Sequence, residues 1–181
     1  MRNRYKNHAM DLTFNKDTAR QDVFATVRNF LQENGFTVVT EDMERPWGGF
    51  FVIDERQASK FKNRFFDGAT EGSEGAGVGR LSPKILVVES NKRLSWQYHF
   101  RRSEIWKVIG GDVGIVRSND DTEGALEKKK YNDTIALHQG ERHRLIGLDS
   151  WGIIAEIWQH TDSNHPSDEN DIIRVQDDFG R

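Results

Sequence analysis

The sequence predicts an all-β domain, a sandwich or small barrel, preceded by an amphipathic helix. Downstream of Pro83 the chain holds seven short apolar segments separated by turns rich in Gly, Asn and Asp, as in sandwiches and barrels. Between Asp17 and Gly35, apolar residues instead recur at helical spacing. The length of 181 residues fits one domain with one core. We therefore divide the chain into an N-terminal helical extension, residues 1–40, and a barrel domain, residues 41–181.

Local patterns justify each element in turn. The helix has apolar residues at positions i, i+1, i+4, i+7 and i+8, and Gly35 is its expected stop. Those apolar residues are Val23, Phe24, Val27, Phe30 and Leu31. The predicted strands cover residues 36–40, 50–53, 84–89, 94–100, 104–109, 113–117, 134–137, 143–146 and 151–158. Glycine-rich residues 69–80 predict a surface loop, and the charged residues 123–130 predict a solvated face.

Composition narrows the classes of function. The formal charge of −3 and the lack of a basic cluster interleaved with aromatic residues argue against nucleic-acid binding. The sequence has no cysteine, so any metal must be held by histidine, carboxylate or amide ligands, and a cytoplasmic setting is expected. It has no apolar run long enough for a signal peptide or a membrane span, so we expect a soluble protein.

Four polar residues of the barrel segments form a candidate metal site. Gln97 and His99 lie two positions apart on one predicted strand, so their side chains point to the same face. Glu104 follows a predicted tight turn, and His143 begins a later strand. Imidazole, carboxylate and amide oxygen without thiols suit zinc, iron or manganese and leave room for water or substrate. A single histidine on a strand is usually structural, so this prediction depends on the spacing of all four residues.

The spacing Q-x-H-x4-E-x6-G, followed by G-x2-H-R-L, resembles the two motifs of the cupin family. Further segments make the chain similar to phosphomannose isomerases that are fused to, or related to, sugar-1-phosphate nucleotidylyltransferases. These segments are RPWG at 45–48, LSWQYH at 94–99, EIW at 104–106, HRL at 143–145, DIIR at 171–174 and DFGR at 178–181.

Departures from the family pattern fall mainly at turns. Asn91 and Asn132 replace glycines, and asparagine tolerates a left-handed backbone nearly as well. His138 and Gly147 also differ from the usual proline and asparagine. Residues 55–81 replace what is usually a short link, and this stretch could reshape the pocket.

The resemblance implies a cupin fold, which is a jelly-roll or double-stranded β-helix barrel. It implies one divalent metal held by Gln97, His99, Glu104 and His143, with zinc first and iron, manganese or nickel as alternatives. It also implies that the partner is a small-molecule phosphosugar. The implied reaction is aldose–ketose isomerisation through an enediol, first of all of mannose 6-phosphate to fructose 6-phosphate.

Five further residues are candidates for catalysis or substrate binding. Lys84 matches a lysine of the family pattern and is the first acid/base candidate, although a strand-capping role is equally open. Glu156 could be a base, a partner of a ligand histidine, or part of a plain salt bridge. Arg174, counted with the catalytic candidates, and Arg144 suit phosphate, but strand alternation turns Arg144 away from the ligand face. Trp47 is a candidate sugar contact, with core packing as the usual alternative.

Other functions stay open at this point. A binding or regulatory cupin could sense a sugar without turnover, and an isomerase could act on another aldose phosphate, such as that of glucose or a heptose. An iron-dependent oxygenase fits less well, because Gln97 stands where such enzymes usually have a histidine. We also expect a homodimer that pairs through edge strands or through the helix at residues 17–34.

Overall fold

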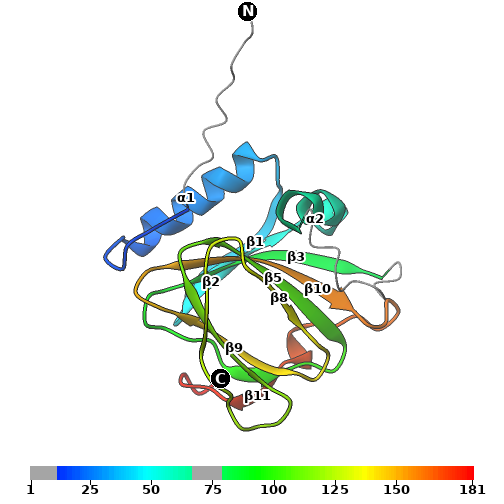
Figure 1. Cartoon of the computed structure of the whole chain (residues 1–181). Helices are drawn as coiled ribbons and strands as arrows, with labels where there is room; N and C mark the ends of the chain where they lie inside the picture. Colours follow the sequence, from blue (N-terminus) through cyan, green and yellow to red (C-terminus); the bar gives the residue numbers. More distant parts are fainter. Residues whose placement is uncertain (1–11, 67–78) are drawn as a thin grey trace, which may run out of the picture.

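The computed structural model of the chain describes residues 12–66 and 79–181, which form two antiparallel sheets facing each other (Figure 1). The six-stranded sheet consists, in spatial order, of β1 (Val38–Arg45), β2 (Gly48–Ile53), β3 (Leu81–Val88), β10 (Gly152–His160), β5 (Arg102–Gly110) and β8 (Thr134–Leu137). The five-stranded sheet consists of β11 (Ile173–Gln176), β4 (Trp96–Tyr98), β9 (Arg142–Gly147), β6 (Val113–Ser118) and β7 (Glu127–Lys129). The helical segments are α1 (Arg20–Glu33), α2 (Ala58–Phe66), η1 (Glu55–Gln57) and η2 (Glu169–Asp171). This architecture confirms the predicted all-β barrel with an N-terminal helix.

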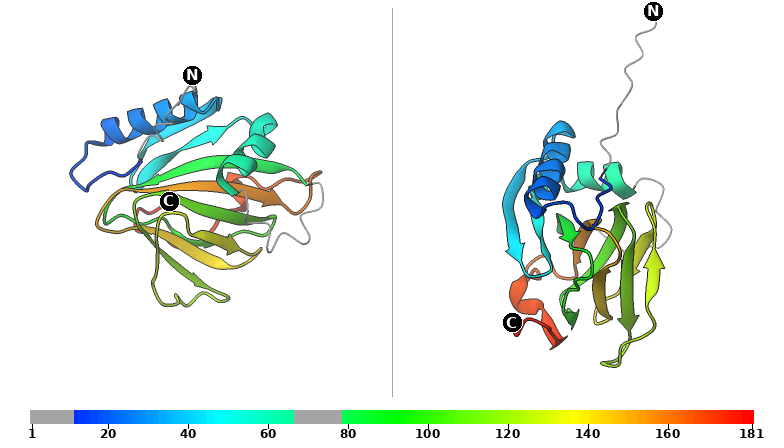
Figure 2. Two further views of the ribbon diagram at one scale, coloured as in Figure 1. Left: turned by 45° about the horizontal axis from the view of Figure 1, so that its top comes forward. Right: turned by 90° about the vertical axis from the view of Figure 1, so that its left-hand side faces the viewer.

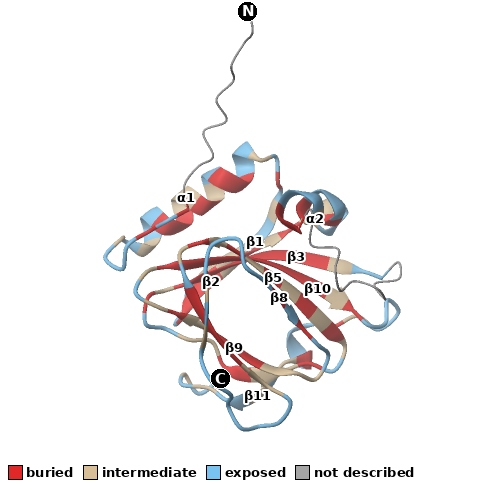
Figure 3. Cartoon of the chain, in the orientation of Figure 1, coloured by how far each residue is buried: buried red, intermediate tan, exposed pale blue. Residues whose placement is uncertain are grey.

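The central strands β3 and β10 of the six-stranded sheet are buried on both faces, and helices lie over the outer side of this sheet (Figures 2 and 3). On β10, Ile153 and Ile157 pack in the cluster that includes the apolar face of α1, whereas Ile154 packs in the barrel interior. Side chains alternate along a strand, so Glu156 on β10 and Lys84 on β3 share the interior face with Ile154. The sheet thus supports the helices with one face and presents polar side chains to the barrel with the other.

The N-terminal helix is bound into this core. All five apolar residues of its predicted face are buried in α1. Full burial of such a side chain contributes about 1.5–3 kcal/mol. The predicted boundary between residues 40 and 41 falls inside β1, so the extension shares a sheet and a core with the barrel.

Three elements were not predicted. Helix α2 lies in the stretch that replaces the short family link, and β7 and β11 are short edge strands with few buried residues. β7 lies in the charged run 123–130 that was predicted to be a solvated face, and most residues of this run are exposed. The predicted loop at 69–80 lies outside the described residues, apart from Gly79 and Arg80, as does the segment 1–11. Neither described helix has the length and apolar character needed to cross a membrane.

Two turns confirm that asparagine replaces glycine at positions with a left-handed backbone. Asn91 and Asn132 have φ angles of 60° and 75°, in the left-handed region. They are the non-glycine residues with positive φ in the described part of the chain. Asparagine adopts this conformation more readily than most residues because its short polar side chain can hydrogen-bond locally. The turns on either side of the metal-binding segments are therefore formed without the family's glycines.

Candidate metal centre

Three of the predicted ligands lie together inside the barrel. His99 directly follows β4, Glu104 lies in β5 and His143 lies in β9, and one ligand atom from each lies within 4.8 Å of the others. All three residues are buried. Strands β4 and β9 pair at Gln97 and His143, which joins the two sequence motifs across the sheet.

Backbone carbonyls orient both histidines. Nδ1 of His99 lies 3.2 Å from the carbonyl oxygen of Asp171, and Nδ1 of His143 lies 2.9 Å from that of Glu141. A carbonyl oxygen can only accept, so each Nδ1 donates its proton and each Nε2 keeps a lone pair. Each Nε2 thus carries the lone pair that a metal would use, in the tautomer that metal-binding histidines adopt when Nδ1 is held by a hydrogen bond.

The charges in the cluster fit a divalent cation. Burial lowers the pKa of His143 to about 4, so its ring is neutral at neutral pH. Burial opposes ionisation of Glu104, but Arg102 and His99 outweigh it and hold the pKa of this carboxyl well below its usual range. Nε2 of His143 is buried without a hydrogen-bond partner in the described residues. An ionised carboxylate beside an unsatisfied imidazole nitrogen is a donor set that a metal ion would complete.

Gln97, the fourth predicted ligand, lines the same pocket as Glu104. Its side-chain oxygen accepts a hydrogen bond of 2.6 Å from the Ser95 hydroxyl. An amide oxygen has two lone pairs, so one remains for a metal. The role of Gln97 as a ligand stays a prediction.

Arg102 belongs to the cluster, although sequence reasoning missed it. Its Nε donates to Glu104 at 2.7 Å, and its Nη2 lies 3.1 Å from Nε2 of His99. The side chain is 1% exposed, and its guanidinium lies 3.5 Å from the centre of the Trp158 ring. The sequence signal that could have identified Arg102 is its position two residues before Glu104, because residues two apart on a strand share a face. Arg102 keeps Glu104 ionised and contacts the ring nitrogen that a metal would use.

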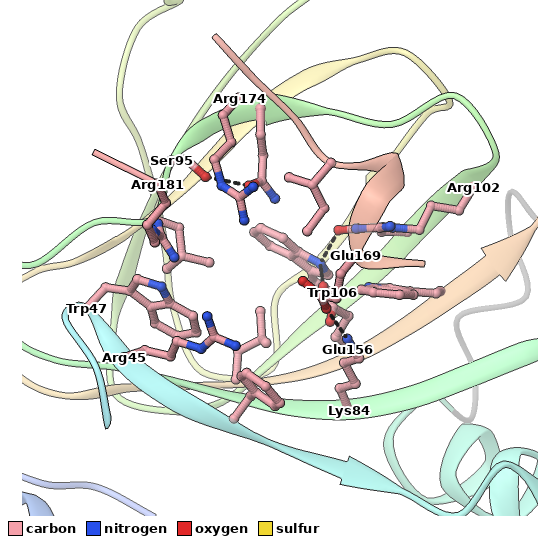
Figure 4. Close-up of a pocket in the computed structure, with 17 residues that line it drawn as sticks. Arg45, Trp47, Lys84, Ser95, Arg102, Trp106, Glu156, Glu169, Arg174 and Arg181 are labelled. Atoms are coloured by element: carbon pink, nitrogen blue, oxygen red, sulfur yellow. Dashed lines mark hydrogen bonds and ion pairs between the residues drawn. The ribbon is translucent and has the colours of Figure 1, made fainter. Parts of the chain in front are cut away.

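A pocket that opens to solvent lies beside this cluster (Figure 4). Lys84 and Glu156, both predicted acid/base residues, lie opposite each other on β3 and β10 and line it. Nζ of Lys84 lies 3.5 Å from the carboxylate of Glu169 and 3.4 Å from the centre of the Trp158 ring. Burial lowers the pKa of Lys84, which increases the share of neutral amine.

The indole of Trp106 links the acid/base residues to the metal cluster. Its Nε1 donates to Glu104 at 3.1 Å and to Glu156 at 3.0 Å. Burial, followed by the charge of Glu104, raises the pKa of Glu156 to about 8. Two carboxyl groups joined by one donor thus differ in protonation, with Glu104 ionised and Glu156 protonated at neutral pH.

Replacing Glu156 by glutamine is expected to stabilise the metal-free protein, and more so as the pH rises. In the unfolded chain this carboxyl ionises near its ordinary pKa of 4.5, whereas in the folded chain it keeps its proton up to about pH 8. The wild type therefore loses stability between these values, because only the unfolded state releases the proton there. Glutamine does not titrate, and its oxygen can still accept from Trp106.

We expect the advantage of Glu156→Gln to grow by about 3–4 kcal/mol between pH 5 and pH 8. Thermal unfolding of chelator-treated protein at both pH values measures it. An advantage of the same size at both pH values would contradict a raised pKa.

The remaining predicted site residues separate into two groups. Arg174 and Trp47 line the pocket. Arg144 lies outside that lining, fully buried, and donates to Glu123 at 2.6 Å and to the side chain of Gln176 at 2.9 Å. Strand alternation turns it to the other face of β9, so we do not carry Arg144 into the substrate-binding proposal.

Besides Arg102, three charged residues of the lining were not assigned a role from the sequence. They are Arg45, Glu169 and Arg181. Two of them are arginines of the quoted RPWG and DFGR segments, and only the folded chain reveals that these distant segments meet.

Comparison with known proteins adds the family. The sequence model of the family described as mannose-6-phosphate isomerase C-terminal matches residues 76–177. The chain belongs to this family. The matched part contains all four predicted ligands together with Lys84, Glu156 and Arg174, whereas Arg45, Trp47 and Arg181 of the pocket lie outside it.

Individual proteins similar to this mannose-6-phosphate isomerase C-terminal domain support the family assignment and the barrel fold. A mannose-1-phosphate guanylyltransferase of Salmonella montevideo is 25% identical over 162 residues, which are 89% of this chain and 28% of the relative. A vicilin from hazelnut, Corylus avellana, superposes with a TM-score of 0.53 at 13% identity, covering 78% of this chain and 36% of the vicilin. A mutant of Bacillus subtilis oxalate decarboxylase superposes with a TM-score of 0.53 at 10% identity, covering 75% of this chain and 30% of the decarboxylase. The predicted cupin barrel is confirmed.

Proposed function

We propose that this domain is a metal-dependent aldose–ketose isomerase of phosphosugars, with mannose 6-phosphate to fructose 6-phosphate as its first reaction. The observation that carries the proposal is the buried cluster of His99, Glu104 and His143 beside Lys84 and Glu156. The family is named for a mannose-6-phosphate isomerase, which supports the substrate. The chain spans 28% of the guanylyltransferase that it matches, so we do not transfer that activity to it.

The reaction requires two proton movements, which Lys84 and Glu156 can divide between them. In the open-chain aldose a base removes the proton from C2 and returns it to C1, while O1 gains a proton and O2 loses one. A lysine with a lowered pKa suits the carbon proton, since part of it is neutral amine. A carboxyl group that is protonated at neutral pH can donate to O1 and then, as a carboxylate, accept from O2. The pair ends the cycle in its starting protonation state.

The other residues hold and shield these groups. A divalent ion held by His99, Glu104, His143 and Gln97 would orient the sugar oxygens and stabilise the negative charge that develops on them. We put zinc first because histidine and carboxylate ligands suit it, with iron, manganese and nickel as alternatives. Arg102 keeps Glu104 ionised, and the indoles of Trp106 and Trp158 exclude water from the acid/base pair.

The test is an isomerase assay on purified, metal-loaded protein. Mannose 6-phosphate is compared with glucose 6-phosphate and a heptose phosphate, in H₂O and in D₂O. Formation of fructose 6-phosphate with deuterium at C1 is the expected result, because an enediol exchanges its carbon proton with solvent before the proton returns to C1. His99→Ala is the inactive control.

Absence of turnover on all of these sugars with metal bound would overturn the isomerase. Binding without turnover would then favour a sugar-sensing cupin, the other function considered. Turnover of glucose or heptose phosphate alone would keep the reaction and change the substrate.

Two properties of the whole protein belong to this proposal. We propose a homodimer, and a monomer mass by light scattering at micromolar concentration would contradict it. The face of α1 that lies outside its buried apolar residues is the surface that we propose for this dimer contact. A cytoplasmic location is proposed from the absence of cysteine and is tested by fractionation.

A further inference from the structure

Three arginines gather at one end of the pocket. Arg45 ends β1, Arg174 lies in β11 and Arg181 follows in the C-terminal segment, yet all three line the same space. In Figure 4 their guanidinium groups face one another beside Trp47, while Lys84, Glu156 and Arg102 lie on the opposite side. The proposed function uses the second group and leaves Arg45 and Arg181 without a role.

The charges of these arginines are only partly compensated. Arg45 forms an ion pair with Asp42 through Nε at 2.8 Å, and Arg181 pairs with Asp177 at 2.9 Å. Nε of Arg174 is buried without a hydrogen-bond partner in the described residues. A buried donor without a partner is costly, so a ligand that accepts from it is favoured. Two of the three guanidinium groups thus have a carboxylate partner, and the buried Nε of Arg174 is left to a ligand.

The cations at the opposite end of the pocket already have carboxylate partners. Arg102 pairs with Glu104 at 2.7 Å, and Lys84 pairs with Glu169 at 3.5 Å. The planar guanidinium groups of the three arginines instead offer paired donors that match phosphate oxygens. A sugar phosphate that places its phosphate on the arginines extends its other end toward the histidine cluster.

We propose that Arg45, Arg174 and Arg181 form a phosphate subsite, and that Arg45 and Arg181 determine specificity for sugars phosphorylated on the carbon remote from the reacting carbonyl. This proposal rests on the proposed function and deepens it. Trp47 lies against the subsite and limits its size, since its indole is buried and lines the same space. Sugars without the phosphate bind poorly, because nothing then satisfies Arg174.

The test measures phosphate binding apart from turnover. Inorganic phosphate, mannose 6-phosphate and mannose are titrated calorimetrically into metal-loaded wild type, Arg45→Gln, Arg181→Gln and the double variant. We expect each single change to weaken the binding of phosphate and of mannose 6-phosphate about tenfold and the double change about a hundredfold. Mannose is expected to bind weakly and equally to all of them. Arg56→Gln, which removes an exposed arginine outside the pocket, is the matched control and is expected to match wild type.

Kinetics and conservative variants separate specificity from structure. In the isomerase assay the same variants are expected to raise KM for mannose 6-phosphate by these factors while kcat changes less than about threefold. Arg45→Lys and Arg181→Lys, which keep the charge, are expected to recover part of the affinity and to melt like wild type. Equal phosphate affinity in wild type and the double variant would overturn the subsite.

The two proposals can fail separately. Weakened phosphate binding in the variants, with no isomerase activity in any form, would keep the subsite and remove the isomerase. Isomerase activity with an unchanged KM in the double variant would keep the isomerase and remove the subsite.

Discussion

Replacing His143 by alanine is expected to abolish metal retention and, with it, isomerase activity. The change removes the ligand atom Nε2, which has no hydrogen-bond partner in the described residues, together with the bond of Nδ1 to the Glu141 carbonyl. We expect the metal content after dialysis to fall from about one ion per chain to below about 0.1, and kcat to fall by at least about a thousandfold. Elemental analysis and the mannose 6-phosphate assay measure the two effects.

The matched control is His138→Ala, which removes an exposed histidine from the turn between β8 and β9. It is expected to retain both metal and activity. Retention of a stoichiometric metal by His143→Ala would show that the cluster is structural and would contradict the metal centre.

Replacing Lys84 by methionine is expected to lower kcat about a thousandfold without loss of the metal. Methionine has nearly the length of lysine and can fill the space over Trp158, but it cannot accept a proton. Lys84 is not among the predicted ligands, so the metal content and the affinity for phosphate should stay within about twofold of wild type. A steady-state assay with parallel elemental analysis separates the loss of chemistry from the loss of the site.

Lys92→Met, which removes one positive charge from an exposed residue, is the control, and we expect it to leave turnover unchanged. Turnover by Lys84→Met within about tenfold of wild type would remove Lys84 from the mechanism. Glu156 would then be the remaining candidate for moving the carbon proton.

Strand alternation and helical periodicity were enough to predict most of the architecture. The apolar face of α1 and the central strands carry strong periodic signals, because each must bury one or both faces. Helix α2 was missed although Phe61 and Phe65, four residues apart, form a helical pair. The short edge strands β7 and β11 have few buried residues, so no local pattern distinguishes them from loops. Their structure depends on pairing with β6 and β4, which lie elsewhere in the sequence.

The candidate site was predictable where residues lie close together on one strand or match a motif. Spacing and resemblance suggested His99, Glu104 and His143, and the structure brings them together. Arg102 could have been inferred from its place two residues before Glu104. The meeting of Arg45 with Arg181 could not, because it depends on how the end of β1 and the C-terminal segment come together at one end of the pocket.

The central claim is that the buried cluster holds a catalytic metal, and anomalous scattering from crystals of the metal-loaded protein tests it most directly. The account predicts one peak at about 2.0–2.2 Å from Nε2 of His99, Nε2 of His143 and a carboxylate oxygen of Glu104. Gln97 is expected to complete the set, with Arg102 bonded to Glu104 alone. A peak elsewhere, or full metal occupancy with the Arg102 guanidinium still on Nε2 of His99, would contradict it.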